Sequence, residues 1–266
     1  MRGQARAPLI ALLTDFGARD WYVAAMKGVI LARAPRAQLV DITHEIPPQD
    51  ILAGAFTLAA AAPWFPRGTV IVAVVDPGVG SARGLLAARC DGRYLLGPDN
   101  GVLALALQHG TRSTVIRLTS RRFWRETISR TFHGRDILAP VAAHLACGGA
   151  FAALGVPASR ITPLEWPSVQ RRGRRWRGRI VHIDAFGNLM TNLPGTVLAS
   201  GRTSAPVVRY QGRRASVVSS YGAGAPNRLM AVVNALGMME LAVKNASAAA
   251  VYTARRGDPV EVVTNS

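Results

Sequence analysis

Runs of apolar residues alternate with helix-like segments along the N-terminal part of this chain. The continuous apolar runs are typical of strands buried on both faces of a parallel sheet, and they predict strands over 9–13, 38–42 and 69–75. The remaining pattern predicts helices over 21–33, 50–62 and 137–146. This alternation indicates an α/β domain with a mostly parallel sheet, whose ligands bind beyond the carboxyl ends of the strands.

The C-terminal part has a different pattern, with short β-like runs separated by Gly, Asn and Pro. The runs cover 180–183, 207–210, 215–218, 249–252 and 260–263. Such spacing is typical of a small antiparallel barrel or sandwich. Glycines, prolines and an arginine run separate the two patterns. We therefore predict an α/β domain over 1–165, an arginine-rich linker over 166–178 and a β-rich domain over 179–266.

The charge of the chain raises the question of an anionic partner, since the formal net charge is +17 over 266 residues. Arginine supplies nearly all of it, because Lys27 and Lys244 are the only lysines. One cluster lies within 171–179, where a tryptophan at 176 could stack on a base. No DNA- or RNA-binding motif accompanies this cluster, so the sequence predicts an exposed linker rather than a nucleic-acid partner.

Two further features bear on location and on metal binding. No uninterrupted apolar run reaches the roughly 18 residues of a membrane span, and the N-terminus lacks the pattern of a secretory leader. We therefore expect a cytoplasmic protein with no membrane partner. Cys90 and Cys147 lie far apart without a CxxC spacing, so we expect two small buried apolar residues and no metal site.

A strand ending in a carboxylate is the first candidate for chemistry. Asp76 closes the apolar run 69–75, a glycine-rich turn follows, and Arg83 comes seven residues later. The glycines allow a close approach to a ligand, and Arg83 can fold back to orient an ionised Asp76. The alternative is a turn with a surface ion pair. Neither GxxxxGK[ST] nor GxGxxG is present, so the turn is not a phosphate loop.

The second candidate is His133, which lies between Phe132 and Gly134 just before a predicted helix with its N-cap near Asp136. A histidine in this place can act as an acid, a base or a hydrogen-bond donor near neutral pH. The alternative is a histidine that satisfies nearby backbone groups. Arg135 and Asp136 are interpreted as an internal structural pair.

Two loops complete the set of motifs. The segment 184–192 combines Asp184, Phe186 and Asn188 in one loop at a strand end. An amide can donate to and accept from a purine edge, and a phenyl ring can stack on it; a tight Asx turn is the alternative. The segment 97–101 is interpreted as a turn with a helix cap.

Taken together in this order, the segments resemble the S-adenosyl-L-methionine (SAM) hydroxide adenosyltransferase family, which is related to the fluorinating and chlorinating adenosyl enzymes. The resemblance covers nearly the whole chain. The matching segments are Leu13-Thr14-Asp15-Phe16-Gly17, Asp41-Ile42-Thr43-His44, Val75-Asp76-Pro77-Gly78-Val79-Gly80, Gly97-Pro98-Asp99-Asn100-Gly101, Phe132-His133-Gly134-Arg135-Asp136 and Asp184-Ala185-Phe186-Gly187-Asn188.

The resemblance implies hydrolysis of SAM to adenosine and methionine by a homotrimer with active sites between subunits, and no cofactor. It places the catalytic set on Asp76, Arg83 and His133. The implied substrate contacts are Asp15 for the ribose diol, Asp184 for the methionine ammonium, Phe186 and Asn188 for adenine, and Tyr221 and Glu240 as further contacts. One position departs from the family: Ala235 stands where a serine hydroxyl binds the methionine carboxylate.

Two other functions stay open at this point. One is transfer of a halide to the ribose C5′ of SAM. Asp76 argues against it, because halogenating relatives carry an aromatic residue at this position and a carboxylate repels an anion. The other is a protein that binds adenosine or nucleic acid without turnover. Retention of all three candidate catalytic side chains favours hydrolysis over both alternatives.

Overall fold

The computed structural model describes residues 7–199 and 205–264 and divides the chain into two compact units. Unit 1 is Met1–Glu165 and unit 2 is Trp166–Ser266. Each unit has its own buried hydrophobic core, two clusters in unit 1 and one in unit 2.

Unit 1 is built on a seven-stranded sheet with the strand order β2-β1-β3-β5-β4-β6-β7. The strands are β1 (Leu9–Thr14), β2 (Gln38–Thr43), β3 (Val70–Val74), β4 (Leu85–Cys90), β5 (Arg93–Pro98), β6 (Ser113–Leu118) and β7 (Gly155–Pro157). β2, β1, β3 and β5 run parallel, whereas β4, β6 and β7 join antiparallel. The predicted α/β domain is confirmed, and its parallel part is the half that carries the N-terminal motifs.

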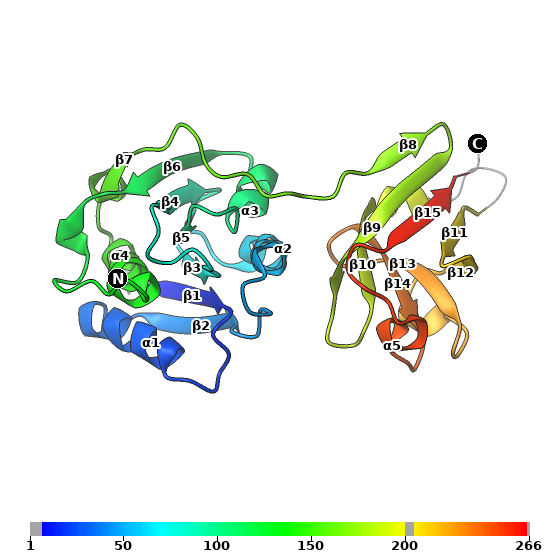
Figure 1. The fold of residues 1–266 in the computed structure, drawn as a ribbon, viewed down its shortest axis with the longest axis horizontal. Coiled ribbons are helices and arrows are strands. Elements are labelled where there is room, and N and C mark those ends of the chain that lie inside the picture. The colour runs from blue at the N-terminus through cyan, green and yellow to red at the C-terminus, as the bar shows by residue number, and fades with distance from the viewer. Residues whose placement is uncertain (1–6, 200–204, 265–266) are drawn as a thin grey trace, which may run out of the picture. The chain divides into compact units, whose positions relative to one another are not determined.

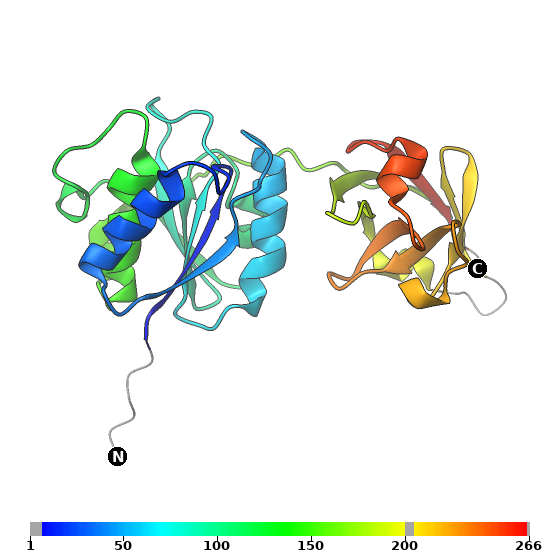
Figure 2. The same ribbon diagram turned by 90° about the horizontal axis from the view of Figure 1, so that it is seen from below.

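Helices cover both faces of this sheet (Figures 1 and 2). They are α1 (Tyr22–Arg33), α2 (Ile51–Ala61), α3 (Ala104–His109) and α4 (Ala139–Ala146), and a π-helical turn (Gly134–Leu138) leads into α4. α1 and α4 pack on one face, and α2 and α3 on the other. The β-strand side chains alternate accordingly: Ile10 joins the first core cluster, and Ala11 joins the second.

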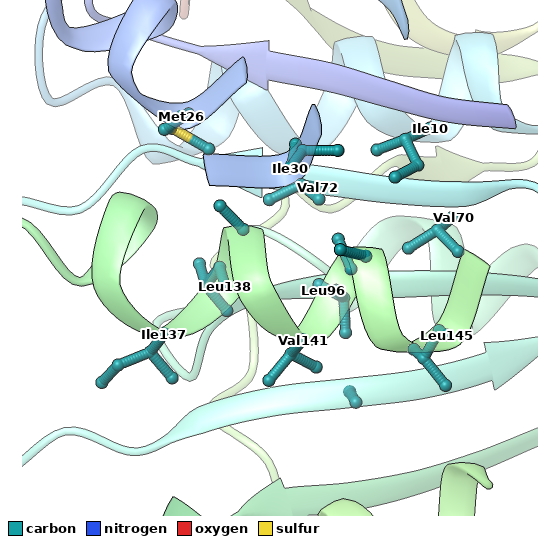
Figure 3. Packing of buried hydrophobic residues seen from close by; sticks show 14 of the residues in the cluster. Ile10, Met26, Ile30, Val70, Val72, Leu96, Ile137, Leu138, Val141 and Leu145 are labelled. Carbon is teal, nitrogen blue, oxygen red and sulfur yellow. The ribbon is translucent and has the colours of Figure 1, made fainter. Parts of the chain in front are cut away.

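Figure 3 shows the packing of α4 against the sheet. Leu138, at the end of the π-helical turn, and Val141 and Leu145 of α4 belong to the same core cluster as Val72 and Leu96 of the sheet. All five side chains are at most 4% exposed. Tight burial of this kind holds the segment before α4, which contains His133, in a fixed place relative to the strand ends.

Unit 2 is a closed barrel with one extra strand. Its eight-stranded sheet has the order β10-β14-β13-β12-β11-β15-β9-β8, and pairing of β10 with β9 closes seven of these strands into the barrel. The strands are β8 (Gln170–Arg172), β9 (Arg175–Ile183), β10 (Leu189–Pro194), β11 (Val207–Tyr210), β12 (Arg213–Val217), β13 (Leu229–Val233), β14 (Met238–Val243) and β15 (Pro259–Val263). All neighbours are antiparallel except β12 and β13, which run parallel. The expected β-rich domain is thus a barrel.

Three local predictions were wrong. Residues 249–252 are not a strand but part of a helix, α5 (Ala248–Tyr252), because Ser247 caps it by accepting a hydrogen bond from the Ala250 N–H at 3.0 Å. Cys147 is exposed beyond the end of α4, whereas Cys90 is buried as expected. The helix before α4 begins at Gly134, so Asp136 lies inside the first turn and is not its N-cap.

The arginine run is also not a linker. It forms a hairpin of β8 and β9 around Gly173, whose φ of +56° is a left-handed conformation that favours glycine. Along β9, exposed arginines alternate with Trp176, Gly178 and Ile180, which face the barrel interior. This period of two is the pattern of a half-buried strand. The segment was nevertheless predicted as a linker because it contains so many arginines.

Candidate active site

Two carboxylates meet at the carboxyl ends of neighbouring parallel strands in unit 1. Thr14 of β1 is paired with Val74 of β3, so Asp15 and Asp76, which follow these strands, lie on the same edge of the sheet. Both residues line one cavity with a volume of about 590 Å³, and His133 lines it as well. The structure therefore brings together residues that are 118 positions apart between Asp15 and His133.

Arg83 links Asp76 to His133. Its guanidinium makes a bidentate pair with Asp76, with Nε donating to Oδ1 at 2.6 Å and Nη2 donating to Oδ2. The same Nη2 lies 3.1 Å from Nδ1 of His133. The side chains of Arg83 and Asp76 are only 10% and 7% exposed, so this is not the surface ion pair that was the alternative. Bidentate pairing fixes the plane of both groups.

The histidine in this set is neutral. Burial and the neighbouring Arg83 cation together lower the pKa of His133, and the Asp76 and Asp136 carboxylates only partly oppose them. Because a guanidinium has no acceptor, Nδ1 of His133 must accept the hydrogen bond from Arg83. The remaining ring proton is then on Nε2. The imidazole is thus a hydrogen-bond donor through Nε2 and not a base at that atom.

Asp15 lies across the cavity from this set and is held by the loop that follows β2. Its Oδ2 accepts a hydrogen bond from the Gln49 N–H at 2.8 Å. Gln49 adopts a φ of +66°, which points its N–H into this turn. Partial burial, together with the nearby Asp76 charge, raises the pKa of Asp15 despite that hydrogen bond. A carboxylate short of donors is suited to accept from a diol.

The glycine-rich turn after Asp76 packs directly against the segment that precedes His133. Gly80 has a φ of +81°, and a Cβ at this position would collide with the backbone oxygen of Arg130. Only glycine allows this approach. The turn therefore serves to bring the segments of Asp76 and His133 together, and it does so by backbone contact.

Asp136 holds the segment that precedes His133 in place through buried hydrogen bonds. It is fully buried and accepts from Arg125 at 2.9 Å, from Arg135 at 2.7 and 2.9 Å, and from the Ser129 N–H at 2.8 Å. Burial would raise the pKa of Asp136, but these hydrogen bonds hold it below the ordinary value. The structural pair expected for Arg135 and Asp136 is present, with Arg125 as a third member that the sequence did not suggest.

A second network of polar side chains supports the end of β1, just before Asp15. His44 lies with Nδ1 2.9 Å from Oγ1 of Thr14 and with Nε2 3.0 Å from Oδ1 of Asp41. Lys27 donates to the other oxygen of Asp41 at 2.6 Å. Asp41 thus pairs with its neighbours at the sheet edge, and this motif positions the end of β1 instead of lining the cavity.

The loop between β9 and β10 in unit 2 carries Asp184, Phe186 and Asn188. Oδ1 of Asp184 accepts from the backbone N–H groups of Phe186 and Asn188 at 2.9 and 2.8 Å, and Oδ2 accepts from Nδ2 of Asn188 at 3.0 Å. This is the tight Asx turn that was the alternative for this motif. The turn leaves the Phe186 ring 80% exposed. It exposes an apolar ring beside a fixed amide.

A cavity of about 630 Å³ lies beside this loop in unit 2, lined by Phe186, Asn188, Tyr221 and residues of the segment 243–246. Tyr221 donates from its hydroxyl to Oε1 of Glu240 at 2.6 Å. Burial raises the pKa of Glu240. The pKa of Tyr221 is also raised, mainly by burial and in addition by the hydrogen bond to Glu240.

Glu240 itself is fully buried, and its second oxygen accepts from Nδ2 of Asn234 at 3.3 Å. Within unit 2, both carboxylate oxygens of Glu240 are therefore bonded to neighbouring side chains. It orients the tyrosine hydroxyl. Ala235 is exposed in the turn between β13 and β14, where Asn234 accepts from two backbone N–H groups.

Several cavity residues escaped the sequence analysis. Gln49, Tyr22 and Thr131 line the cavity around Asp15 and His133. A Pro-Pro pair before Gln49 was the one available signal of an irregular loop. Asn100 supports the end of β3 by donating to the Val75 carbonyl at 2.8 Å, a role that the turn interpretation of 97–101 did not include.

Within residues 7–199 and 205–264, no group of three His, Cys, Asp or Glu side chains could hold a metal ion. Over the same residues, no helix has the length and apolar character needed to cross a bilayer.

Comparison with known proteins gives matches over both units. The profile of the SAM hydroxide adenosyltransferase N-terminal domain matches residues 10–155, and the profile of the C-terminal domain matches residues 178–261. A protein of Salinispora tropica named (R)-S-adenosyl-L-methionine hydrolase is 38% identical over 262 residues, which cover 97% of this chain and 98% of that protein.

More distant relatives include a fluorinase of an Actinoplanes species, 29% identical over 218 residues that cover 72% of this chain and 73% of that enzyme. A solved structure of an uncharacterised conserved protein from Thermotoga maritima has a TM-score of 0.89 and 31% identity to this chain. That match covers 96% of this chain and 99% of the other.

Proposed function

Because this chain belongs to the SAM hydroxide adenosyltransferase family, we propose that it hydrolyses SAM to adenosine and L-methionine. The name of the Salinispora relative further points to the (R)-sulfonium epimer as the substrate. The observation that carries the proposal is that Asp76 and His133 line one cavity with Asp15 and that Arg83 links the two.

The reaction needs a positioned water more than an acid. The sulfonium of SAM is already a good leaving group, so an oxygen nucleophile can displace it at the ribose C5′. A bond forms between water oxygen and C5′, the C5′–S bond breaks, and its electron pair becomes a lone pair of the methionine thioether. One proton of the water is released. Adenosine, methionine and one proton balance SAM and water.

Asp76 and His133 can hold this water from two sides. Each oxygen of Asp76 keeps a lone pair besides the one used by Arg83 and can accept a water proton. Nε2 of His133 can donate to the water oxygen, because Nδ1 is occupied by Arg83. This arrangement orients a lone pair of the water toward the carbon that it attacks.

The same carboxylate argues against halide transfer. A halide that enters the cavity must lose part of its hydration shell next to the Asp76 charge, and the cavity offers little to offset this cost. We therefore propose a neutral water, and not chloride or fluoride, as the nucleophile, although a fluorinase is among the relatives.

The remaining candidate residues are assigned to binding of the substrate. We propose that Asp15 accepts from the ribose diol and that Phe186 and Asn188 contact adenine by stacking and by the amide. Asp184 is assigned to the methionine ammonium, with Tyr221 as a further contact oriented by Glu240. Ala235 lacks the serine hydroxyl, and the N–H groups of Leu236 and Met238 already donate to Asn234, so we assign no partner in this turn to the methionine carboxylate.

Incubation of the purified protein with each SAM epimer, followed by chromatography, tests the proposal. We expect equimolar adenosine and methionine from the (R)-epimer, at the same rate with a chelator present and with chloride or fluoride added. An adenosine yield no greater than that of an enzyme-free control would contradict hydrolysis. A 5′-halo-adenosine as the main product would show halide transfer, and retained SAM without turnover would show a binding protein.

We also propose a cytoplasmic homotrimer, with each substrate bound between neighbouring subunits. The support is the family membership together with the division of the candidate contacts between Asp15 in one unit and the Asp184 loop in the other. Light scattering should give three times the mass of 28.3 kDa. A monomer of full activity would contradict sites shared between subunits.

A further inference from the structure

Unit 2 carries a surface of arginines that the proposed hydrolysis does not use. Residues 166–266 contain 14 Arg and Lys against four Asp and Glu, a formal net charge of +10. Eight of the 13 arginines in unit 2 lie on β8, β9, β11 and β12. Together with β15, these are five adjacent strands of the sheet (Figure 1). We call the six on the outer side the arginine face: Arg172, Arg175, Arg177, Arg179, Arg209 and Arg214.

Strand register puts these side chains on one side. Within an antiparallel pair, directly opposed residues point to the same face. Arg177 of β9 is opposed to Glu261 of β15, Glu261 to Arg209 of β11, and Arg209 to Arg214 of β12. The pairs form one row across four strands, roughly 4.8 Å apart from strand to strand.

A second direction runs along β9. Arg175, Arg177 and Arg179 alternate with residues that face the barrel interior, so their side chains follow one another at roughly 7 Å. Arg172 of β8 is opposed to Arg175 and extends the face at its edge. The result is a two-dimensional array of guanidinium groups on a sheet.

This array is poorly neutralised by the protein itself. Glu261 is the one acidic residue in the five strands, and it lies 3.9 Å from Arg177. Among the residues that the structure describes, the side chains of Arg175, Arg209 and Arg214 have no ion-pair or hydrogen-bond partner. Opposed like charges such as Arg209 and Arg214 destabilise a sheet. A cost without a local gain is typical of a surface that serves binding.

The chemistry of the face identifies the partner as a polyanion with regularly spaced charges. Arginine forks match phosphate oxygens and stay charged at every physiological pH. Membrane-binding surfaces combine basic residues with exposed apolar ones. None of the large apolar side chains that are exposed in the described residues belongs to these five strands. The face therefore fits the phosphate backbone of a nucleic acid better than a lipid surface.

Trp176 does not supply base stacking, although its sequence position suggested it. Its side chain packs against the core of the barrel, and the Arg171 guanidinium covers its ring at 4.7 Å from the centroid. Without an exposed aromatic ring, contacts to bases are not expected from the face. Binding should then depend on phosphates and be independent of sequence.

We propose that the arginine face is a sequence-independent binding surface for nucleic acid. The proposal does not rest on SAM hydrolysis, since the face shares no residue with the candidate active site. It also reverses the sequence-based expectation, because only the strand register shows that arginines far apart in the chain, such as 175 and 214, lie on one surface.

Fluorescence anisotropy with a labelled mixed-sequence DNA duplex tests the proposal on the full chain. We expect a Kd on the order of 1 µM at low salt. The triple variant Arg175→Gln, Arg209→Gln and Arg214→Gln should bind at least about tenfold more weakly, and the slope of log K against log salt should fall by about 2 to 3. Hydrolysis of SAM and the Tm should not decrease.

A matched control removes the same charge elsewhere. Arg36, Arg89 and Arg112 are exposed in unit 1, and their replacement by Gln should change the Kd less than about threefold. Equal weakening by both triple variants would overturn the proposal, since net charge alone would then explain binding. So would the absence of duplex binding at low salt, or binding to vesicles of anionic phospholipid in preference to the duplex.

Discussion

Alanine in place of His133 should lower kcat for SAM hydrolysis by about a hundredfold or more, with a smaller change in substrate affinity. The imidazole is bound to Arg83 on one nitrogen and is free to hold water with the other. That interaction is needed when water attacks and not when substrate binds. Steady-state kinetics on the purified variant give the split between kcat and KM.

Asp15→Ala is the contrasting variant. Its carboxylate lies in the same cavity and is assigned to the ribose, so its loss should weaken binding of adenosine itself. Calorimetry with adenosine should show this loss for Asp15→Ala and little change for His133→Ala. Full activity of His133→Ala, or unchanged adenosine affinity of Asp15→Ala, would overturn these assignments.

The pH dependence of kcat provides a further test of His133. Burial and the Arg83 cation lower the pKa of this imidazole from its ordinary value near 6.5. Protonation of Nδ1 would break the hydrogen bond with Arg83. We therefore expect kcat to decrease as pH falls, with the midpoint of the decrease below 6.5. A decrease centred above 6.5 would contradict the neutral assignment.

Asp136→Asn should be the most destabilising single substitution proposed here, by about 3 kcal/mol or a Tm lower by roughly 6–12 °C. The variant keeps the side-chain shape but removes a buried carboxylate that accepts from two arginines and a backbone N–H. Because the same carboxylate holds the segment before His133, kcat should also fall. Thermal unfolding followed by circular dichroism, together with the hydrolysis assay, measures both effects.

The pH at which this difference disappears is set by the carboxylate. The folded-state pKa of Asp136 is below its ordinary value, so its contribution is present above about pH 4 and is lost as pH falls through the folded-state pKa. Asp91 serves as the control, since it accepts from Thr111 and Arg112 in an exposed turn. Asp91→Asn should lower Tm less and leave kcat unchanged. Equal effects of the two variants would contradict the anchoring role.

Local pattern was sufficient for the elements of unit 1 that carry the site. Strands at 9–13 and 69–75 were predicted from continuous apolar runs, and they correspond to β1 and β3. Since carboxyl ends of parallel strands share one edge, the sequence placed Asp15, Asp41 and Asp76 together at that edge. Asp41 pairs with Lys27 and His44 and does not line the cavity. The arrangement of β4, β6 and β7 was not predicted. The pairings of β6 with β4 and with β7 join segments distant in the chain, and the short hairpin of β4 and β5 was missed.

Local pattern led to wrong predictions for the arginine run and for residues 249–252, because charge or apolar character was given more weight than periodicity and capping. The arginine run was interpreted as a linker from its charge, although its alternation with Trp176, Gly178 and Ile180 is that of a strand. The apolar run at 249–252 was interpreted as a strand, although Ser247 provides a helix cap. In both cases a neighbouring barrel strand or cap decided the outcome.

The sequence by itself determined which residue types stand at the strand ends and which family the chain resembles, because both depend on short contiguous motifs. Only the tertiary structure decided that Arg83 joins Asp76 to His133, 50 positions further on, and that Glu240 is buried behind Tyr221. It also decided that the arginines of β9, β11 and β12 share a face. Contacts of this range depend on packing and strand register, which no local window of the sequence contains.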